Sequence, residues 1–276
     1  MSSHVERDNH PIDINTRHLI SNRYKRITKA VNIEFWNSTS ETTHSRYVGS
    51  YGRGTAIFTS DLDVLIELPE TTFQRFSDRT GNGQSQLLQT VKSAIESTYA
   101  TTNISGDGQV VVANFTDGIK FEILPAFQNR NWIGAWNGTY KYPNTHMGGN
   151  WMTTNPYAEQ AAMDEKDDSN HSNGLLKDTC KHIRFVKAEC FPHFHLSGIL
   201  IDTFVYNAIM DWHWLGPDEQ KRNRAPISYE QQLLNYYNSF AYNNYCKPIL
   251  YAPGSNAEVS VGSEWNILGK VLNEMV

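Results

Sequence analysis

The chain has 276 residues and a formal net charge of −5 at pH 7, and 39% of its residues are hydrophobic. That apolar content is enough for a folded core and excludes a disordered chain, while the length allows one large domain or two small ones. No stretch approaches the ~20 apolar residues of a membrane span, and residues 1–10 are polar, unlike a signal peptide. We therefore expect a cytoplasmic protein. The negative charge argues against a protein that coats long nucleic acid with its whole surface.

The chain has three cysteines, Cys180, Cys190 and Cys246. They are odd in number and widely spaced, which makes a poor disulfide framework and fits a reducing compartment. Cys190 is followed by His193 and His195, which invites a zinc interpretation. The segment has no second cysteine pair and no standard zinc spacing, however. A loop that ends a helix and carries surface histidines is the favoured interpretation.

An amphipathic helix is predicted near the N-terminus, because apolar residues recur there in steps of three and four. A glycine-rich segment follows at residues 47–55, and residues 61–68 are then predicted as a strand with acids at its start. The apolar positions of the N-terminal helix are Ile20, Tyr24, Ile27, Val31 and Phe35.

Further along, a helix is predicted over residues 87–99 and two strands over residues 109–115 and 119–124. The Asp117-Gly118 pair between these strands predicts a hairpin. Residues 127–155 show no clear pattern. The expected fold is α+β, a small sheet lobe packed on a helical lobe with a cleft between them. The helical lobe is predicted from four segments: 175–190, 197–214, 228–245 and 263–275.

Two carboxylates, Asp61 and Asp63, lie two residues apart on the predicted strand, so both project from the same face. Leu65 follows them on that face. Two adjacent carboxylates repel each other unless a cation lies between them, and Mg²⁺ prefers such hard oxygen ligands. The alternative is a pair of exposed acids at a strand end. The opposite face, predicted to point into the core, carries Leu62, Val64 and Ile66.

The glycine turn strengthens the metal interpretation. Gly49 allows the backbone N–H groups to approach a phosphate closely, and the Ser50 hydroxyl can donate a further hydrogen bond. A third acid, Glu122, lies on a strand between Phe121 and Ile123, where a charge is costly to bury unless it is paired or bound to metal. Three carboxylates would complete a two-metal site. A solvent-facing strand acid remains the alternative for Glu122.

Two segments resemble the cGAS/DncV-like nucleotidyltransferases (CD-NTases) of bacterial CBASS antiphage defence, which belong to the polymerase-β-like superfamily. They are residues 49–56 (Gly-Ser-Tyr-Gly-Arg-Gly-Thr-Ala) and 60–65 (Ser-Asp-Leu-Asp-Val-Leu). Residues 121–126 look like the family's third-carboxylate strand, and residues 149–156 like its Trp and Asn-Pro segment. Residues 177–187 look like the first helix of its second lobe. The family often has Asp where this chain has Glu122.

The resemblance implies a two-lobed polymerase-β-like fold with the active site in the cleft between the lobes. Residues 1–156 would form the catalytic lobe, a small mixed sheet with a long N-terminal helix, and residues 157–276 the helical lobe that completes the nucleotide pocket. It implies two Mg²⁺ ions, for which Mn²⁺ can substitute. The implied metal ligands are Asp61, Asp63 and Glu122, and the implied residues at the donor triphosphate are Gly49 and Ser50.

A basic helix face is the last candidate feature. Lys177, Lys181 and Arg184 recur in steps of four and three, so they share one face, and Lys187 lies a further turn along. The resemblance places a lysine of this helix on the triphosphate, and Lys187 matches best. Lys177 and Lys181 could face either nucleotide or water, and a solvated cationic face is the alternative for all of them. The predicted core side of the helix carries Leu176, Cys180, Ile183 and Val186.

The resemblance also implies the function: synthesis of a cyclic di- or trinucleotide from nucleoside triphosphates, which then activates an effector protein. We expect a monomer that needs neither long nucleic acid nor a membrane. One alternative is a nucleotidyltransferase that modifies tRNA, a protein or a small molecule. Another is an inactive module that only binds nucleoside triphosphates, although three carboxylates around phosphate argue against a pure binder.

Overall fold

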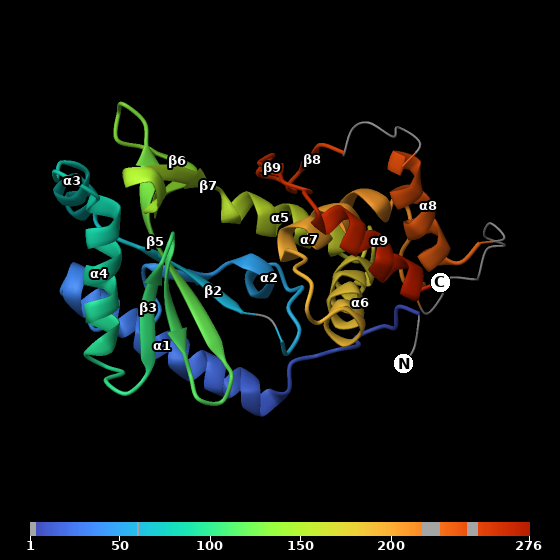
Figure 1. The fold of residues 1–276 in the computed structure, drawn as a ribbon, viewed down its shortest axis with the longest axis horizontal. Coiled ribbons are helices and arrows are strands. Elements are labelled where there is room, and N and C mark those ends of the chain that lie inside the picture. The colour runs from blue at the N-terminus through green and yellow to red at the C-terminus, as the bar shows by residue number, and fades with distance from the viewer. Residues whose placement is uncertain (1–3, 60, 217–226, 242–247) are drawn as a thin grey trace. The chain divides into compact units, whose positions relative to one another are not determined.

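The structure is a computed structural model, and it describes residues 4–59, 61–216, 227–241 and 248–276 (Figure 1). Ser60, Cys246 and the end of the helix expected over 228–245 therefore lie outside the described residues. The chain forms two compact units, each described below by itself. Unit 1 comprises Met1–Ile12, Arg53–Ser60 and Ala158–Val276, and unit 2 comprises Asp13–Gly52 and Asp61–Tyr157. The functional division at residue 156 stays a prediction.

Unit 2 begins with the long helix that the sequence predicted, α1 (Ile14–Trp36). The Asp13 side chain caps its start by accepting hydrogen bonds from two backbone N–H groups, and Asn37 ends it in the left-handed conformation. Ile20, Ile27 and Val31 are buried, which confirms the predicted apolar face. In Figure 1, α1 runs beside the strands of this unit.

The sheet of unit 2 is mixed, as predicted. Its strands follow the order β1-β2-β5-β4-β3, and β6 and β7 extend it from β5. β2 and β5 are parallel, and the other neighbours are antiparallel. The strands are β1 (Ser45–Tyr47), β2 (Leu62–Glu67), β3 (Asn103–Asp107), β4 (Val110–Asn114), β5 (Lys120–Arg130), β6 (Trp136–Asn144) and β7 (Asn150–Thr154).

The region that showed no clear pattern, residues 127–155, is a meander of β5, β6 and β7. β5 continues past Pro125, where a proline normally argues for a strand end. Its pairing with β2 persists there: Pro125 is opposite Ile66, and the Leu68 N–H donates to the Ala126 carbonyl. The hairpin at Asp117-Gly118 is confirmed. The remaining short elements of this unit are α2 (Gly49–Gly52), α3 (Glu70–Ser77), α4 (Gly83–Glu96) and a 3-10 turn (His146–Gly148).

Both faces of β2 carry buried residues. Val64 and Ile66 lie in the core as predicted, but Leu65 on the opposite face is also only 3% exposed. It packs with Ala126 and Tyr140. The meander strand β6 supplies Tyr140, so the face that carries the acids at its start is covered by protein further along.

Unit 1 consists mainly of helices around one apolar core. The predicted core side of α6, Leu176, Cys180, Ile183 and Val186, is buried. α7 ends at Ala208, earlier than expected, and Met210 adopts a positive φ just beyond it. The elements are α5 (Pro156–Asp167), α6 (Leu175–Cys190), α7 (Gly198–Ala208), α8 (Tyr229–Ala241), α9 (Glu264–Glu274), β8 (Leu250–Tyr251) and β9 (Glu258–Val259).

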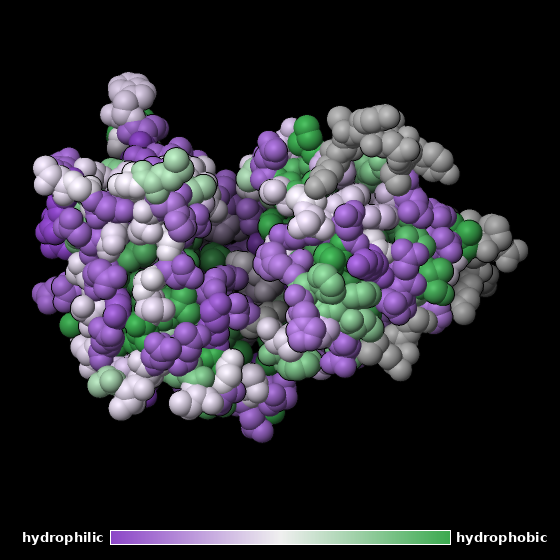
Figure 2. Space-filling view, viewed as in Figure 1, coloured by the Kyte–Doolittle hydropathy of each residue, from purple (hydrophilic) through white to green (hydrophobic). Residues whose placement is uncertain are grey.

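The surface is mainly hydrophilic on the face shown in Figure 2, with smaller hydrophobic patches among the polar residues of each unit. Among the described helices, none is both long and apolar enough to cross a bilayer. α6 ends at Cys190 as expected, and His193 and His195 beyond it are exposed.

Candidate active site

The glycine turn is in direct contact with the acid pair. Gly49 has a φ of +56°, and a Cβ at this position would lie 1.8 Å from Oδ2 of Asp63. The Val48 N–H donates to the Asp63 carbonyl oxygen at 2.9 Å, and the Gly52 N–H donates to the Val48 carbonyl oxygen at 2.9 Å. Only glycine allows both this backbone conformation and this close approach. Ser50 follows within the turn and is 9% exposed.

The third acid lies beside the second. Asp63 of β2 is directly opposite Glu122 of the parallel strand β5. Neighbouring strands are ~4.8 Å apart, so the two carboxylates start from adjacent positions on one face of the sheet. Asp61 immediately precedes β2, and its side chain is 49% exposed. The structure thus brings Asp63 and Glu122, which are 59 positions apart in the chain, to directly opposite positions on neighbouring strands.

A lysine that the sequence analysis did not consider lies within this site. Lys120 Nζ is 2.9 Å from Oδ2 of Asp61 and 2.5 Å from Oε1 of Glu122. Partial burial lowers the pKa of Lys120, but the hydrogen bonds and charges of Glu122 and Asp61 outweigh this effect and raise the pKa above its usual value. A signal for Lys120 was available, because residues two apart on a strand share a face and Glu122 was already a candidate.

Whether these residues suit a metal ion can be judged from the donor set. The three carboxylates do not converge on one point, and within the described ranges no three His, Cys, Asp or Glu side chains are close enough to hold a metal. Asp61 and Glu122 nevertheless share one cation, the Lys120 ammonium group. Carboxylate oxygens are the ligands that Mg²⁺ prefers. The donor set therefore fits Mg²⁺ in its chemistry, whereas the side-chain positions in this structure do not form a three-carboxylate metal site.

The three candidate lysines lie on α6 in unit 1 and have different surroundings. Lys177 Nζ is 2.6 Å from Asp164 and 3.6 Å from Asp167, and Lys181 Nζ is 3.7 Å from Asp178. Lys187 is half-buried, and no ion pair of its side chain occurs in the part of the chain that the structure describes. Lys177 and Lys181 are thus neutralised within their own unit.

One residue of the predicted basic face is buried instead. Arg184 is 7% exposed, and its guanidinium group lies 2.7 Å from Asp202 of α7. It also donates to the backbone carbonyls of Cys180 and Gly198. The helical spacing was right, but the face that carries Arg184 packs against protein because Asp202 offers a buried counter-charge.

A family model described as "Second Messenger Oligonucleotide or Dinucleotide Synthetase domain" (SMODS) matches residues 5–167, more than half of the chain. The chain belongs to this family. The match includes the glycine turn and all three acids and ends before α6. It confirms the resemblance to the cGAS/DncV-like nucleotidyltransferases that the motifs indicated.

Solved structures confirm the polymerase-β-like α+β fold of this SMODS protein. A CdnE cyclic dinucleotide synthase from Elizabethkingia meningoseptica has a TM-score of 0.62 at 12% identity, with 96% of this chain and 97% of that chain covered. A STING-associated CdnE c-di-GMP synthase from Capnocytophaga granulosa has a TM-score of 0.61 at 14% identity, with 94% and 80% covered. Vibrio cholerae DncV, a cyclic AMP-GMP synthase, has a TM-score of 0.59 at 10% identity, with 94% and 81% covered. No curated protein sequence matches significantly.

A second residue of this SMODS protein escaped the sequence analysis. Asp202 is fully buried and lies in the apolar run Gly198–Ala208 of α7. Its pKa is raised by burial, but the charges of Arg184 and Arg53 outweigh burial and lower it to about 2. A charged residue within an apolar helix was the available signal, because it is costly to bury without a partner.

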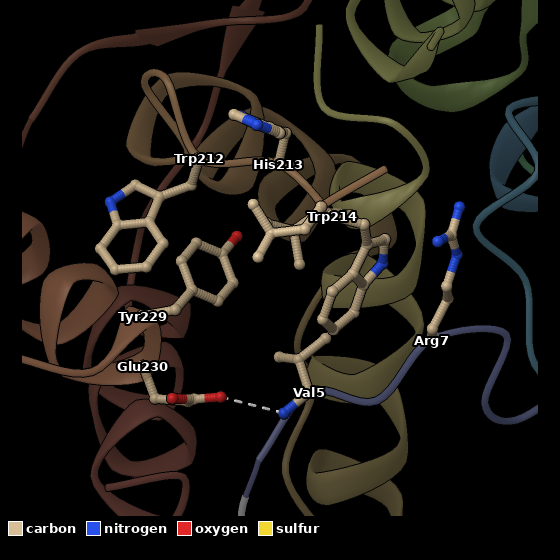
Figure 3. A pocket seen from close by; sticks show the side chains of 9 residues that line it. Val5, Arg7, Trp212, His213, Trp214, Tyr229 and Glu230 are labelled. Carbon is tan, nitrogen blue, oxygen red and sulfur yellow. Dashed lines mark hydrogen bonds between the residues drawn. The ribbon is translucent and has the colours of Figure 1, made fainter. Parts of the chain in front are cut away.

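Unit 1 also contains a cavity of about 390 Å³ that is separate from the predicted site residues. Figure 3 shows the rings of Trp212, Trp214 and Tyr229 around it, with Glu230 accepting a hydrogen bond from the Val5 N–H. Its lining contains none of the eight residues that the sequence predicted for the site.

Proposed function

We propose that this chain condenses nucleoside triphosphates into a cyclic di- or trinucleotide second messenger. The observation that carries the proposal is the contact between Gly49 and the Asp63 carboxylate, with Glu122 directly opposite Asp63. A phosphate-binding turn that touches a carboxylate pair has the parts of a nucleotidyl-transfer site. Membership of the SMODS family supports the same reaction.

We further propose that Asp61, Asp63 and Glu122 hold two Mg²⁺ ions, for which Mn²⁺ can substitute. When bound, such ions would neutralise the triphosphate and activate the attacking hydroxyl group. The chain would contribute the carboxylate oxygens, of which those of Asp63 and Glu122 start from opposite positions on β2 and β5. Before a metal binds, Lys120 limits the repulsion between Asp61 and Glu122 by bridging them.

In the proposed reaction, a ribose hydroxyl of one nucleotide attacks the α-phosphorus of another. The bond to the β-phosphate breaks, pyrophosphate leaves, and the hydroxyl proton is released to water. The linear product keeps one triphosphate, and attack on its α-phosphorus by the free ribose hydroxyl at the other end closes the ring and releases a further pyrophosphate. We assign the backbone N–H groups after Gly49 and the Ser50 hydroxyl to the donor triphosphate. Lys187 is the lysine we favour for the same triphosphate. Lys177 and Lys181 are weaker candidates, because acids of their own unit already pair with them.

The proposed substrates are nucleoside triphosphates alone, without template or acceptor. The Elizabethkingia CdnE structure contains GTP and Apcpp, which supports purine nucleotides as the first substrates to test. We propose that the cyclic product acts on an effector protein in the bacterial cytoplasm, and that the enzyme works as a monomer without long nucleic acid or a membrane.

The test is an incubation of the purified chain with the four labelled nucleoside triphosphates and Mg²⁺, with products separated before and after phosphatase treatment. A cyclic product has no terminal phosphate, so we expect phosphatase-resistant label. Asp63→Asn should abolish it without unfolding the protein. Asp78→Asn, an exposed aspartate at the end of α3, is the matched control and should retain activity.

Three other results of this assay would contradict the proposal, and each would indicate a different function. A ladder of linear products would indicate a polymerising enzyme. Label transferred to added tRNA or protein would favour a nucleotidyltransferase that modifies macromolecules. Nucleotide binding without any product would leave only a binding module.

A further inference from the structure

A single buried carboxylate in unit 1 gathers three side chains. Oδ2 of Asp202 accepts from Nε of Arg53 at 2.8 Å and from Oγ1 of Thr55 at 3.0 Å. Oδ1 of Asp202 lies 2.7 Å from Nη1 of Arg184. Asp202 and Thr55 are 0% exposed and Arg53 is 5% exposed. Such a charged group persists in an interior only when its partners are present together.

The charges of this cluster would be neutralised even without a bond between Arg53 and Asp202. Arg184 alone would neutralise Asp202, and Arg53 has a second acidic partner in Glu159, whose Oε2 lies 3.1 Å from Nη1 of Arg53. Ser255 in turn donates to Glu159 at 3.1 Å. The Arg53–Asp202 bond therefore joins two pairs that are each already neutral. What it adds is a fixed position for the backbone that carries Arg53.

The backbone that this bond fixes lies directly after the glycine turn, Gly49–Gly52, which is the proposed phosphate-binding turn and is called the phosphate turn below. Arg53 follows Gly52, the last residue of α2. Gly54 packs against the side chain of Lys177, whose Cδ would lie 3.3 Å from a Cβ at residue 54, and Thr55 bonds to Asp202. Three consecutive residues are thus held within unit 1, while the turn itself belongs to unit 2.

Covalent geometry makes this attachment relevant to the turn. Ser50 is three residues before Arg53, and helical residues rise only ~1.5 Å each. A displacement of Arg53 by an ångström or more cannot be absorbed over so short a segment without disturbing the turn. Phosphate recognition by backbone N–H groups is sensitive to displacements of this size.

We propose that Arg53 is a positioning residue for the phosphate turn: its bond to Asp202 holds the backbone after Gly52 so that Gly49 and Ser50 keep the geometry that binds a nucleoside triphosphate. The last clause rests on the proposed function. The effect of Arg53 on the position of the turn does not rest on the proposed function, and it can be measured without nucleotide.

The test compares Arg53→Lys with Arg184→Lys. Both variants keep the positive charge, and both replace a buried guanidinium group that bonds to Asp202. Both should therefore lower the melting temperature. Only Arg53 adjoins the turn, because Arg184 lies within α6. If a variant at Arg53 does not fold, Thr55→Val is the milder alternative. Its matched control is Thr179→Val, which removes the hydroxyl of another fully buried threonine.

The first readout is hydrogen exchange at the Gly52 amide, which bonds to the Val48 carbonyl inside the turn. We expect its protection to fall about tenfold in Arg53→Lys and to stay unchanged in Arg184→Lys. The second readout is steady-state kinetics with nucleoside triphosphates. There KM should rise about tenfold in Arg53→Lys alone, with a smaller change in kcat.

Equal protection of Gly52 in the two arginine variants would overturn the inference, whatever the enzyme does with nucleotides. Altered protection with an unchanged KM would also overturn it, because the turn would then not need this geometry. Selective loss of protection in a protein that forms no nucleotide product would uphold the effect on the turn and reject the proposed function.

Discussion

At the scale of single residues, the close contact between Gly49 and Asp63 joins the proposed phosphate-binding turn to a proposed metal ligand. A larger residue at position 49 would push against the Asp63 carboxylate, and a longer acid at position 63 would push against the turn. The two positions therefore constrain each other. A substitution at one of these positions leaves the residue at the other unchanged, so the contact can be tested from either side.

Gly49→Ala should reduce nucleotidyl transfer about 100-fold or more, because the methyl group would collide with a proposed metal ligand. The positive φ adds a backbone cost of about 1 kcal/mol. Steady-state rates and a thermal unfolding curve measure the two effects separately.

Gly81→Ala is the matched control for backbone strain. Gly81 has a φ of +84°, and no atom lies within 4 Å of a Cβ placed there. We expect a similar loss of stability with normal activity. If both variants lost activity equally, backbone strain and not the contact with Asp63 would explain the result.

Lys120→Met should strengthen metal binding. The Lys120 ammonium group bridges Asp61 and Glu122, so a divalent ion must displace it to use both carboxylates. Calorimetry with Mn²⁺ should show a Kd lowered several-fold. Lys92→Met, which breaks an ion pair with Glu96 on α4, is the control and should leave the Kd unchanged. Weaker metal binding in Lys120→Met would mean that this lysine supports the site instead of competing for it.

At the scale of elements, α6 combines several kinds of basic residue on one helix. Arg184 faces the interior and joins α6 to α7, whereas Lys177 and Lys181 pair with nearby acids. Lys187 is the member whose charge is not committed to an ion pair among the described residues. Helical spacing alone groups these residues together, and their different partners separate them.

Lys187→Ala should raise KM for nucleoside triphosphates by about tenfold, because loss of a point charge weakens ground-state binding. Lys187→Arg should restore most of the affinity. Lys270→Ala on the exposed face of α9 is the control for a general loss of positive charge. Unchanged kinetics in Lys187→Ala would instead favour the alternative, in which Lys187 only belongs to a solvated cationic face of the helix.

The ion pair between Arg184 of α6 and Asp202 of α7 should make the free energy of unfolding depend on pH in the acid range. A carboxyl group whose folded pKa is about 2, below its usual 3.8, stabilises the fold above pH 3.8 and loses this contribution as pH falls towards 2. The difference between these two pKa values corresponds to about 2 kcal/mol in the free energy of unfolding. Burial raises the pKa of Glu159, which is the opposite direction to the shift of Asp202.

Unfolding free energies of the wild type and Asp202→Asn, measured from pH 5 to pH 2, test this expectation. The variant should be less stable at pH 5, and the gap should narrow as pH falls through the window. A gap that stays constant would show that the charge of Asp202 does not contribute to stability.

At the scale of the whole molecule, the net charge of −5 limits the possible partners. Long nucleic acids bind through many phosphate contacts and require a broad basic surface. The basic residues of α6 do not supply one, because most of them pair with acids within unit 1. The charge is compatible with small nucleotides held in one local site.

Added double-stranded DNA or RNA should therefore change the rate of product formation by less than about twofold at moderate salt. The measurement is a rate assay with and without nucleic acid, repeated at two salt concentrations. A large stimulation that disappears at higher salt would contradict this view and indicate a nucleic-acid sensor.

Several local features of this protein could be predicted from the amino-acid sequence alone. The glycine turn, the Asp61 and Asp63 pair, the helix α1 and the hairpin at Asp117-Gly118 are encoded by residues that are close in the chain. Spacing and turn chemistry were therefore enough to predict them. The resemblance to a family then suggested the proposed metal-binding role of Glu122, which no local pattern establishes.

Tertiary structure decided what depends on distant parts of the chain. The parallel pairing of β2 with β5 places Glu122 opposite Asp63 and Lys120 between two acids. The packing of α7 on α6 buries Arg184, which spacing alone had placed with the surface lysines. Strand register and the choice of buried ion pairs depend on which distant segments meet, because a carboxylate such as Asp202 is stable inside a protein only where its cationic partners are brought to it.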